Sequence, residues 1–244
     1  MLARGFAVLL SCFVCACAGS PPHDDASPLG TVATFSIVAF DPDTQELGVA
    51  VASRVVGVGA VVPYAKAGVG AIATQASANP RYGPDALALL AEGKSAEETV
   101  ATLTAADARR DRRQIGVVDA QGRAFTFTGE RCMAWAGGIA GENFCAQGNI
   151  LAGDAVVSAM ADAFRSGTGL LEERLLLALK AGDDAGGDQR GKQSAALLVV
   201  REGWGYAGGN DRYRDVRVDD HEAPIAELER VLALHQAMFR RPRD

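Results

Sequence analysis

The sequence predicts an α+β fold in which two β-sheets are faced by two layers of helices. Strands are expected in adjacent pairs, with a pair of helices after each group of strands and one helix at the end. Most strands are apolar on both faces, as in sheets that are covered on both sides. A doubly wound parallel sheet fits poorly, because its strands would alternate with helices. The chain has 244 residues, of which 48% are hydrophobic, so we expect a single domain with one sizeable core.

The first strand pair is the centre of this prediction. Residues 34–41 and 47–53 are both apolar on their two faces. The five residues between them include Pro42 and Asp43, which favour a hairpin loop. A buried hairpin therefore begins at Thr34.

The remaining elements follow from turn and capping signals. Pro84 suits the first turn of a helix, and Ser95 with Glu98 forms a capping-box pattern for the next one. Asp154 and Pro224 begin later helices, and a further helix is expected over 170–179. The other strands are expected at 58–64, 69–74, 114–118, 124–128, 135–139, 144–147, 194–201 and 213–218.

The N-terminus reads as a targeting segment. Arg4 and the apolar run 6–14, which is too short to span a bilayer, predict a signal peptide over residues 1–18. The sequence Val14-Cys15-Ala16-Cys17 resembles a bacterial lipobox, which implies export, lipid attachment at Cys17 and anchoring to a membrane in the periplasm or cell envelope. Ordinary signal cleavage after Ala18 is the alternative. Residues 19–33 are then a tether, and residues 34–244 a single domain.

Composition argues against several other classes of protein. The net charge of -6 argues against a nucleic-acid partner, which would need clustered positive charge. The three histidines are scattered and no Cys/His spacing suggests zinc, so we expect no metal, no cofactor and no Ser-His-Asp triad. With three of the five cysteines in the targeting segment, Cys132 and Cys145 are expected to pair in an oxidising compartment.

Five separated motifs carry a family resemblance. They lie at 34–39, 48–54, 68–75, 147–153 and 187–196. The motifs resemble the bacterial and archaeal family called domain of unknown function 1028, over nearly the whole predicted domain. The resemblance implies the N-terminal-nucleophile (Ntn) hydrolase-like superfamily and a four-layer αββα sandwich, in agreement with the layers expected above. It implies no particular substrate.

In that superfamily an N-terminal Thr, Ser or Cys attacks an amide carbonyl, with its own α-amine as the base. The resemblance therefore implies Thr34 as the nucleophile and Lys66 as the residue that tunes it. Thr34 would have a free α-amine only after cleavage of the chain after Ala33. No carboxylate lies near Ala50, where members of the proteasome type carry an acid. The alternative is that Thr34 is a β-branched residue that starts a strand.

Polar loops at the strand ends supply candidate substrate-binding residues. Because strand ends meet at one rim of a sandwich, these side chains are expected to line one pocket, where Arg190 would grip a carboxylate with two hydrogen bonds. The alternative is that the polar groups cap turns and helices. The candidates are Gln75, Asn79, Tyr82, Gln147, Asn149, Asp188, Arg190, Gln193 and Ser194.

Two classes of function remain. One is an amide-bond hydrolase that acts on a small or peptide-like substrate of the cell envelope. The other is a non-catalytic envelope module for binding or assembly on the same fold. Whether copies of the chain form a homo-oligomer stays open.

Overall fold

The fold is described from a computed structural model, which describes residues 34–241. These residues lie within one compact unit, Thr31–Asp244. The predicted signal peptide, Cys17 and the tether lie outside the described residues. Among the helices of residues 34–241, none has the length and apolar character needed to cross a membrane.

Two antiparallel sheets form the centre of this unit. The larger sheet has six strands in the order β10-β9-β2-β1-β8-β7, and the smaller has four in the order β3-β4-β5-β6. The strands of the larger sheet are β1 (Thr34–Asp41), β2 (Glu46–Ser53), β7 (Gly137–Gly141), β8 (Phe144–Asn149), β9 (Ser194–Val200) and β10 (Arg212–Val218). The strands of the smaller sheet are β3 (Pro63–Lys66), β4 (Gly70–Ala76), β5 (Arg113–Asp119) and β6 (Ala124–Thr128).

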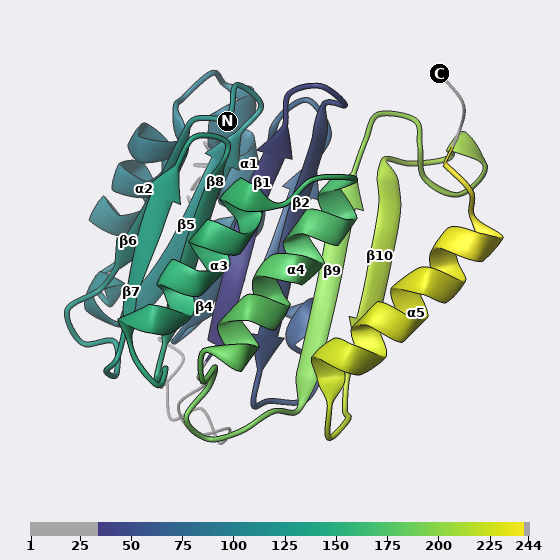
Figure 1. Ribbon diagram of the computed structural model, residues 1–244. Helices are drawn as coiled ribbons and strands as arrows, with labels where there is room; N and C mark the ends of the chain where they lie inside the picture. Colours follow the sequence, from purple (N-terminus) through teal and green to yellow (C-terminus); the bar gives the residue numbers. More distant parts are fainter. Residues whose placement is uncertain (1–33, 242–244) are drawn as a thin grey trace, which may run out of the picture. The chain divides into compact units, whose positions relative to one another are not determined.

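Five α-helices cover the sheets. The helices α3 (Asp154–Ser166), α4 (Leu171–Asp184) and α5 (Pro224–Met238) lie across one face of the larger sheet (Figure 1). The helices α1 (Tyr82–Ala91) and α2 (Ala96–Ala105) pack on the smaller sheet through a cluster that includes Ile72, Leu90 and Ile115. The capping box predicted at Ser95 and Glu98 is present at the start of α2. The prediction of two sheets with helices on them is therefore confirmed.

The strands β1 and β2 of the hairpin are both buried along their whole length, as their sequences predict. Alternate residues enter two different cores: Ile37 packs against the helices α3 and α4, and Val38 packs against the smaller sheet. The register pairs Thr34 with Ser53 at one end of the hairpin and Asp41 with Glu46 at the other. On its other side β1 pairs with β8, which sets Thr34 opposite Asn149.

One predicted strand is only partly formed. Residues 58–64 were expected to be extended, but Val58–Ala60 form a 3-10 turn and β3 begins only at Pro63. Gly57 has a φ of 69°, a backbone conformation that ends extended structure. Proline is tolerated as the first residue of an edge strand because its missing N–H faces away from the ladder.

Candidate functional site

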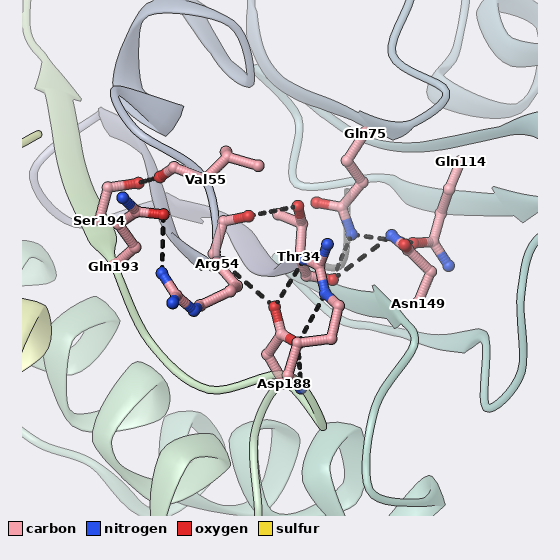
Figure 2. A network of polar contacts seen from close by, with 11 residues as sticks. Thr34, Arg54, Val55, Gln75, Gln114, Asn149, Asp188, Gln193 and Ser194 are labelled. Carbon is pink, nitrogen blue, oxygen red and sulfur yellow. Dashed lines mark hydrogen bonds and ion pairs between the residues drawn. The ribbon is translucent and has the colours of Figure 1, made fainter. Parts of the chain in front are cut away.

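Thr34 is held at the end of β1 by neighbours from both adjacent strands. Its Oγ1 is hydrogen-bonded to Ser53 Oγ at 3.0 Å, and its side chain is fully buried. Its carbonyl accepts from Gln75 Nε2 at 3.2 Å and from Asn149 Nδ2 at 3.5 Å. The hydroxyl and the carbonyl of Thr34 are thus both held by uncharged side chains (Figure 2).

Amide side chains from both sheets connect Thr34 to the space between them. Ser36 Oγ donates to Gln75 Oε1 at 2.6 Å and accepts from Gln147 Nε2 at 2.7 Å. Gln75 comes from β4 of the smaller sheet, whereas Gln147 comes from β8 of the larger one. The side chain of Ser36, two residues along β1 from Thr34, therefore ties the sheets together.

Gln114 is the hub of this network, although it is not among the candidates expected from the sequence. Its Oε1 accepts from Gln75 Nε2 at 2.8 Å and from Asn149 Nδ2 at 3.1 Å. Its Nε2 donates to Thr128 Oγ1 and to the carbonyl of Gly148, both at 2.8 Å. A polar residue that opens an apolar strand, directly opposite Gln75 in the β4–β5 register, was the signal that could have identified it. We call Thr34, Ser36, Ser53, Gln75, Gln114, Gln147 and Asn149 the amide network.

Asp188 lies beside the same end of the hairpin. Its Oδ2 accepts from the backbone N–H of Arg54 at 3.1 Å, directly after Ser53. The guanidinium of Arg190 makes two bonds to this carboxylate, from Nε at 3.2 Å and from Nη2 at 3.0 Å. A small pocket next to this pair is lined in part by Phe35, Ser53 and Asp188. Arg190 is therefore already engaged with Asp188, although its side chain is 32% exposed.

Gln193 and Ser194 shape the loop that follows Ser53. The backbone N–H of Gln193 donates to the carbonyl of Ser53 at 3.0 Å, and its side chain accepts from Arg54 Nη1 at 2.9 Å. Ser194 Oγ accepts from the N–H of Val58 at 3.2 Å and donates to the carbonyl of Val55. In Figure 2 both residues lie beside Arg54 and Val55, and the bonds above go to the segment 53–58 rather than to Thr34.

Asn79 and Tyr82 do not join the amide network. Asn79 Oδ1 accepts from the N–H of Arg81 at 3.2 Å, so it shapes the turn before α1. Tyr82 is buried in the core between the smaller sheet and its helices, where its hydroxyl donates to Asp107 at 2.9 Å. Burial and the bond to Asp107 raise the pKa of Tyr82 above its usual range. The expectation of one pocket is thus corrected for these two residues.

Lys66 lies far from Thr34. It is exposed at the end of β3 and pairs with Gly70, at the opposite end of β4 from Gln75. Five residues of strand separate Gly70 from Gln75, or about 16 Å. Because Gln75 touches Thr34, the structure does not support Lys66 as the residue that tunes this threonine.

The predicted disulfide is not formed. Cys132 Sγ lies 3.4 Å from the carbonyl of Arg113, and Cys145 Sγ lies 3.7 Å from that of Val117. These carbonyls are four residues apart on β5, or about 13 Å, which is too far for one bridge. Burial raises the pKa of both thiols, which keeps them protonated and unreactive.

Comparison with known proteins gives a family and a related structure. Residues 34–228 match the family described as a family of unknown function, DUF1028. The chain is similar to the crystal structure of a DUF1028 protein from Silicibacter pomeroyi, with 32% identity and a TM-score of 0.77, over 84% of this chain and 86% of that one.

A weaker likeness is to Anbu (ancestral beta-subunit) from Yersinia bercovieri, with 10% identity and a TM-score of 0.36, over 86% of this chain and 99% of that one. The sequence matches none of the curated proteins with which it was compared. The length of the first match and the identity to the Silicibacter pomeroyi protein lead to one conclusion: the chain belongs to the DUF1028 family.

Proposed function

We propose that this protein is an amide-bond hydrolase of the Ntn type, with Thr34 as its nucleophile and a small or peptide-like substrate. In this proposal the two sheets and their helices form the four-layer αββα sandwich of that superfamily. The observation that carries the proposal is the double fixation of Thr34. Ser53 holds its hydroxyl, and Gln75 and Asn149 hold its carbonyl.

The base in this reaction is the α-amine of Thr34 itself. Within residues 34–241, the side chains that hydrogen-bond to Thr34 are a hydroxyl and two amides, none of which takes up a proton near neutral pH. A free α-amine has a pKa of about 7.7–8.0, which suits a general base at that pH. The bond between Ala33 and Thr34 must therefore be cleaved before the protein is active.

The chemistry then runs in two steps. Thr34 Oγ1 attacks the substrate's carbonyl carbon while its proton passes to the α-amine, and the C–N bond breaks as that proton moves to the leaving nitrogen. Water next attacks the resulting ester, with the α-amine again as the base. The products are a carboxylic acid and an amine, and the threonine is regenerated.

The surroundings of Thr34 favour a substrate that carries a carboxylate. Arg190 is partly exposed next to the pocket that contains Ser53 and Asp188. A guanidinium presents five N–H donors, so Arg190 can bind the carboxylate of a ligand together with that of Asp188. The lipobox-like sequence around Cys17 extends the proposal to a cell-envelope protein whose precursor is lipid-anchored, and cleavage before Thr34 then releases the active chain from that anchor.

The direct test compares chains that begin at different residues. A chain that begins at Thr34 is expected to hydrolyse a panel of acyl-amino-acid and short peptide amides, whereas a chain that retains residues 19–33 is inert. Thr34→Ala in the shorter chain should lower turnover at least about a thousandfold. Thr99→Ala, a buried threonine on α2, is the matched control and should leave turnover unchanged. Equal activity of both chain lengths would contradict the proposal.

A non-catalytic binding or assembly module is the second candidate. One observation favours it: Thr34 is fully buried, so its side chain exposes no surface that a substrate could reach. In that case the protein keeps the bond between Ala33 and Thr34. The intact mass of protein purified from its native compartment separates the candidates, because only the hydrolase requires a chain that begins at Thr34.

A further inference from the structure

A second polar site lies at the far end of the central hairpin, about 23 Å from Thr34 along β1. Glu46, the first residue of β2, is fully buried there, and so is Glu172 on α4. Burial raises the pKa of Glu46, and the neighbouring Glu172 raises it further. Two buried carboxylates need cations close by, since an unpaired buried charge is strongly unfavourable.

Arg214 on β10 supplies the cation for Glu172. Its Nε donates to Glu172 Oε1 at 3.2 Å, and its Nη2 donates to the hydroxyl of Tyr213. Its Nη1 donates to the carbonyl of Phe239 at 2.9 Å, directly after α5. The same buried guanidinium therefore fixes the start of the segment 239–241 that follows the helix.

Arg241 in this segment supplies a cation for Glu46. Its Nη1 lies 2.8 Å from Glu46 Oε1, although its side chain is still 23% exposed. Its Cζ lies 5.0 Å from the ring centroid of Trp204 and 5.9 Å from that of Tyr213. A buried carboxylate beside two aromatic rings is a suitable receptor for a planar, weakly hydrated cation.

Arg201 shows that the same aromatic wall accepts guanidinium groups. Its Cζ lies 3.7 Å from the ring centroid of Trp204. Both Arg201 and Arg241 lower the pKa of Glu46 and so oppose the effect of burial. The site thus combines the face of a ring with the charge of a buried acid. A guanidinium can stack flat on the ring and bond the carboxylate at two points, whereas an ammonium ion is more strongly hydrated and can do neither.

We propose that Glu46, Trp204 and Tyr213 form a guanidinium-binding pocket, which Arg241 of the same chain occupies as a tethered ligand. When Arg241 is absent, the pocket binds a free guanidinium compound in its place. The segment after α5 is then held to β2 by an exchangeable contact. This site is separate from the amide network and does not depend on any activity of Thr34.

The test uses the full chain with Arg241→Ala and methylguanidinium as the probe. The variant should melt about 4–8 °C below the parent, because the buried carboxylate loses a cation. Millimolar methylguanidinium chloride should recover at least half of that loss in a saturable way, whereas methylammonium chloride of the same concentration should not. Arg240→Ala changes the exposed neighbouring residue and is the matched control, with no loss to recover.

The role of Glu46 is tested in the same background. Glu46→Gln combined with Arg241→Ala should abolish the recovery by methylguanidinium. Equal responses to methylguanidinium and methylammonium would overturn the proposal, and so would equal melting temperatures of the Arg241→Ala and Arg240→Ala proteins. If Arg241→Ala does not fold, the same experiment is done with Arg241→Lys. Methylguanidinium should again recover stability, and an equal response to methylguanidinium and methylammonium would again contradict the proposal.

Discussion

The two ends of the β1–β2 hairpin bury polar groups in opposite ways. At the end of Thr34 and Ser53, the buried groups are hydroxyls and amides that bond to one another. At the end of Asp41 and Glu46, they are carboxylates that face arginines. The same strand pair therefore ends in a neutral network on one side and a charged cluster on the other.

This difference has physical consequences for each end. A hydrogen-bonded amide loses little when it leaves water, provided that all its partners are present. A buried carboxylate depends on its cation, and the loss of one partner leaves a charge in the protein interior. We therefore expect the charged end to respond strongly to single substitutions and weakly to pH, and the neutral end to respond mainly to changes in shape and hydrogen bonding.

The largest effect is expected from Arg214→Met at the charged end. Arg214 and Glu172 are 1% and 0% exposed, so the change leaves a buried carboxylate without its cation. Unfolding by urea should show a loss of about 3–5 kcal/mol. Adding Glu172→Leu should return a large part of it, because the uncompensated charge is gone.

The control for this prediction is an exposed ion pair between α4, the helix that carries Glu172, and α5. Lys180 contacts Glu229 at 2.8 Å with both side chains at least 42% exposed, so Lys180→Met should cost less than about 1 kcal/mol. Equal losses of unfolding free energy for Arg214→Met and Lys180→Met would contradict the comparison.

At the neutral end, Gly116→Ala tests shape. A Cβ at this position would lie 2.1 Å from Gln147 Oε1, and the amide of Gln147 cannot move without losing its bond to Ser36. We expect a loss of about 1–3 kcal/mol in urea unfolding. Gly153→Ala, where nothing lies within 4 Å, is the matched control and should change stability little. If Gly116→Ala lowers the free energy of unfolding no more than Gly153→Ala does, the amide network can rearrange around the added methyl group, which contradicts this prediction.

The smallest expected effect is a pH dependence at the charged end. Burial lowers the pKa of His235, and the positive charge of Arg214, whose Nη1 lies 3.2 Å from the Nδ1 of His235, lowers it further. The unfolded chain then takes up the proton first, so the stability from neutral His235 is complete above about pH 6.5 and falls as the pH drops toward the lower folded value. His235→Gln should flatten this part of the stability profile.

His221→Gln provides the matched control, since His221 lies on the surface before α5. Its profile of unfolding free energy between pH 7 and pH 5 should follow that of the parent protein. Parallel profiles for all three proteins would mean that His235 does not contribute to the acid response.

The sequence predicted the central hairpin well because its signals are local. An alternation of small apolar residues, followed by Pro42 and Asp43, needs no knowledge of distant segments to indicate two buried strands. The strand expected over 58–64 was less accurate, since Gly57 and Gly59 allowed a turn. A Cβ on Gly59 would lie 2.7 Å from Ala196, a contact made by a distant strand.

The candidate site was predicted only in part for the same reason. Gln75 and Asn149 do contact Thr34, and Gln147 contacts Ser36, but their hub Gln114 is recognised only through the register of β4 and β5. Tyr82 faces a different core, although it follows Gln75 closely in sequence. At the charged end, Glu172 lies in the first turn of α4, where acidic residues are usually exposed. The sequence therefore does not indicate that Glu172 is buried, which follows from the packing of Arg214 on β10 against it.

At the neutral end of the hairpin, we propose that the Thr34 hydroxyl becomes a nucleophile when Thr34 gains a free α-amine. The most direct measurement is covalent labelling by a peptide vinyl sulfone, located by mass spectrometry of the proteolysed protein. We expect one probe mass on the peptide that begins at Thr34, and no label on the chain that retains residues 19–33 or on the Thr34→Ala variant. Labelling of both chain lengths alike, or an unlabelled Thr34 in the chain that begins there, would contradict it.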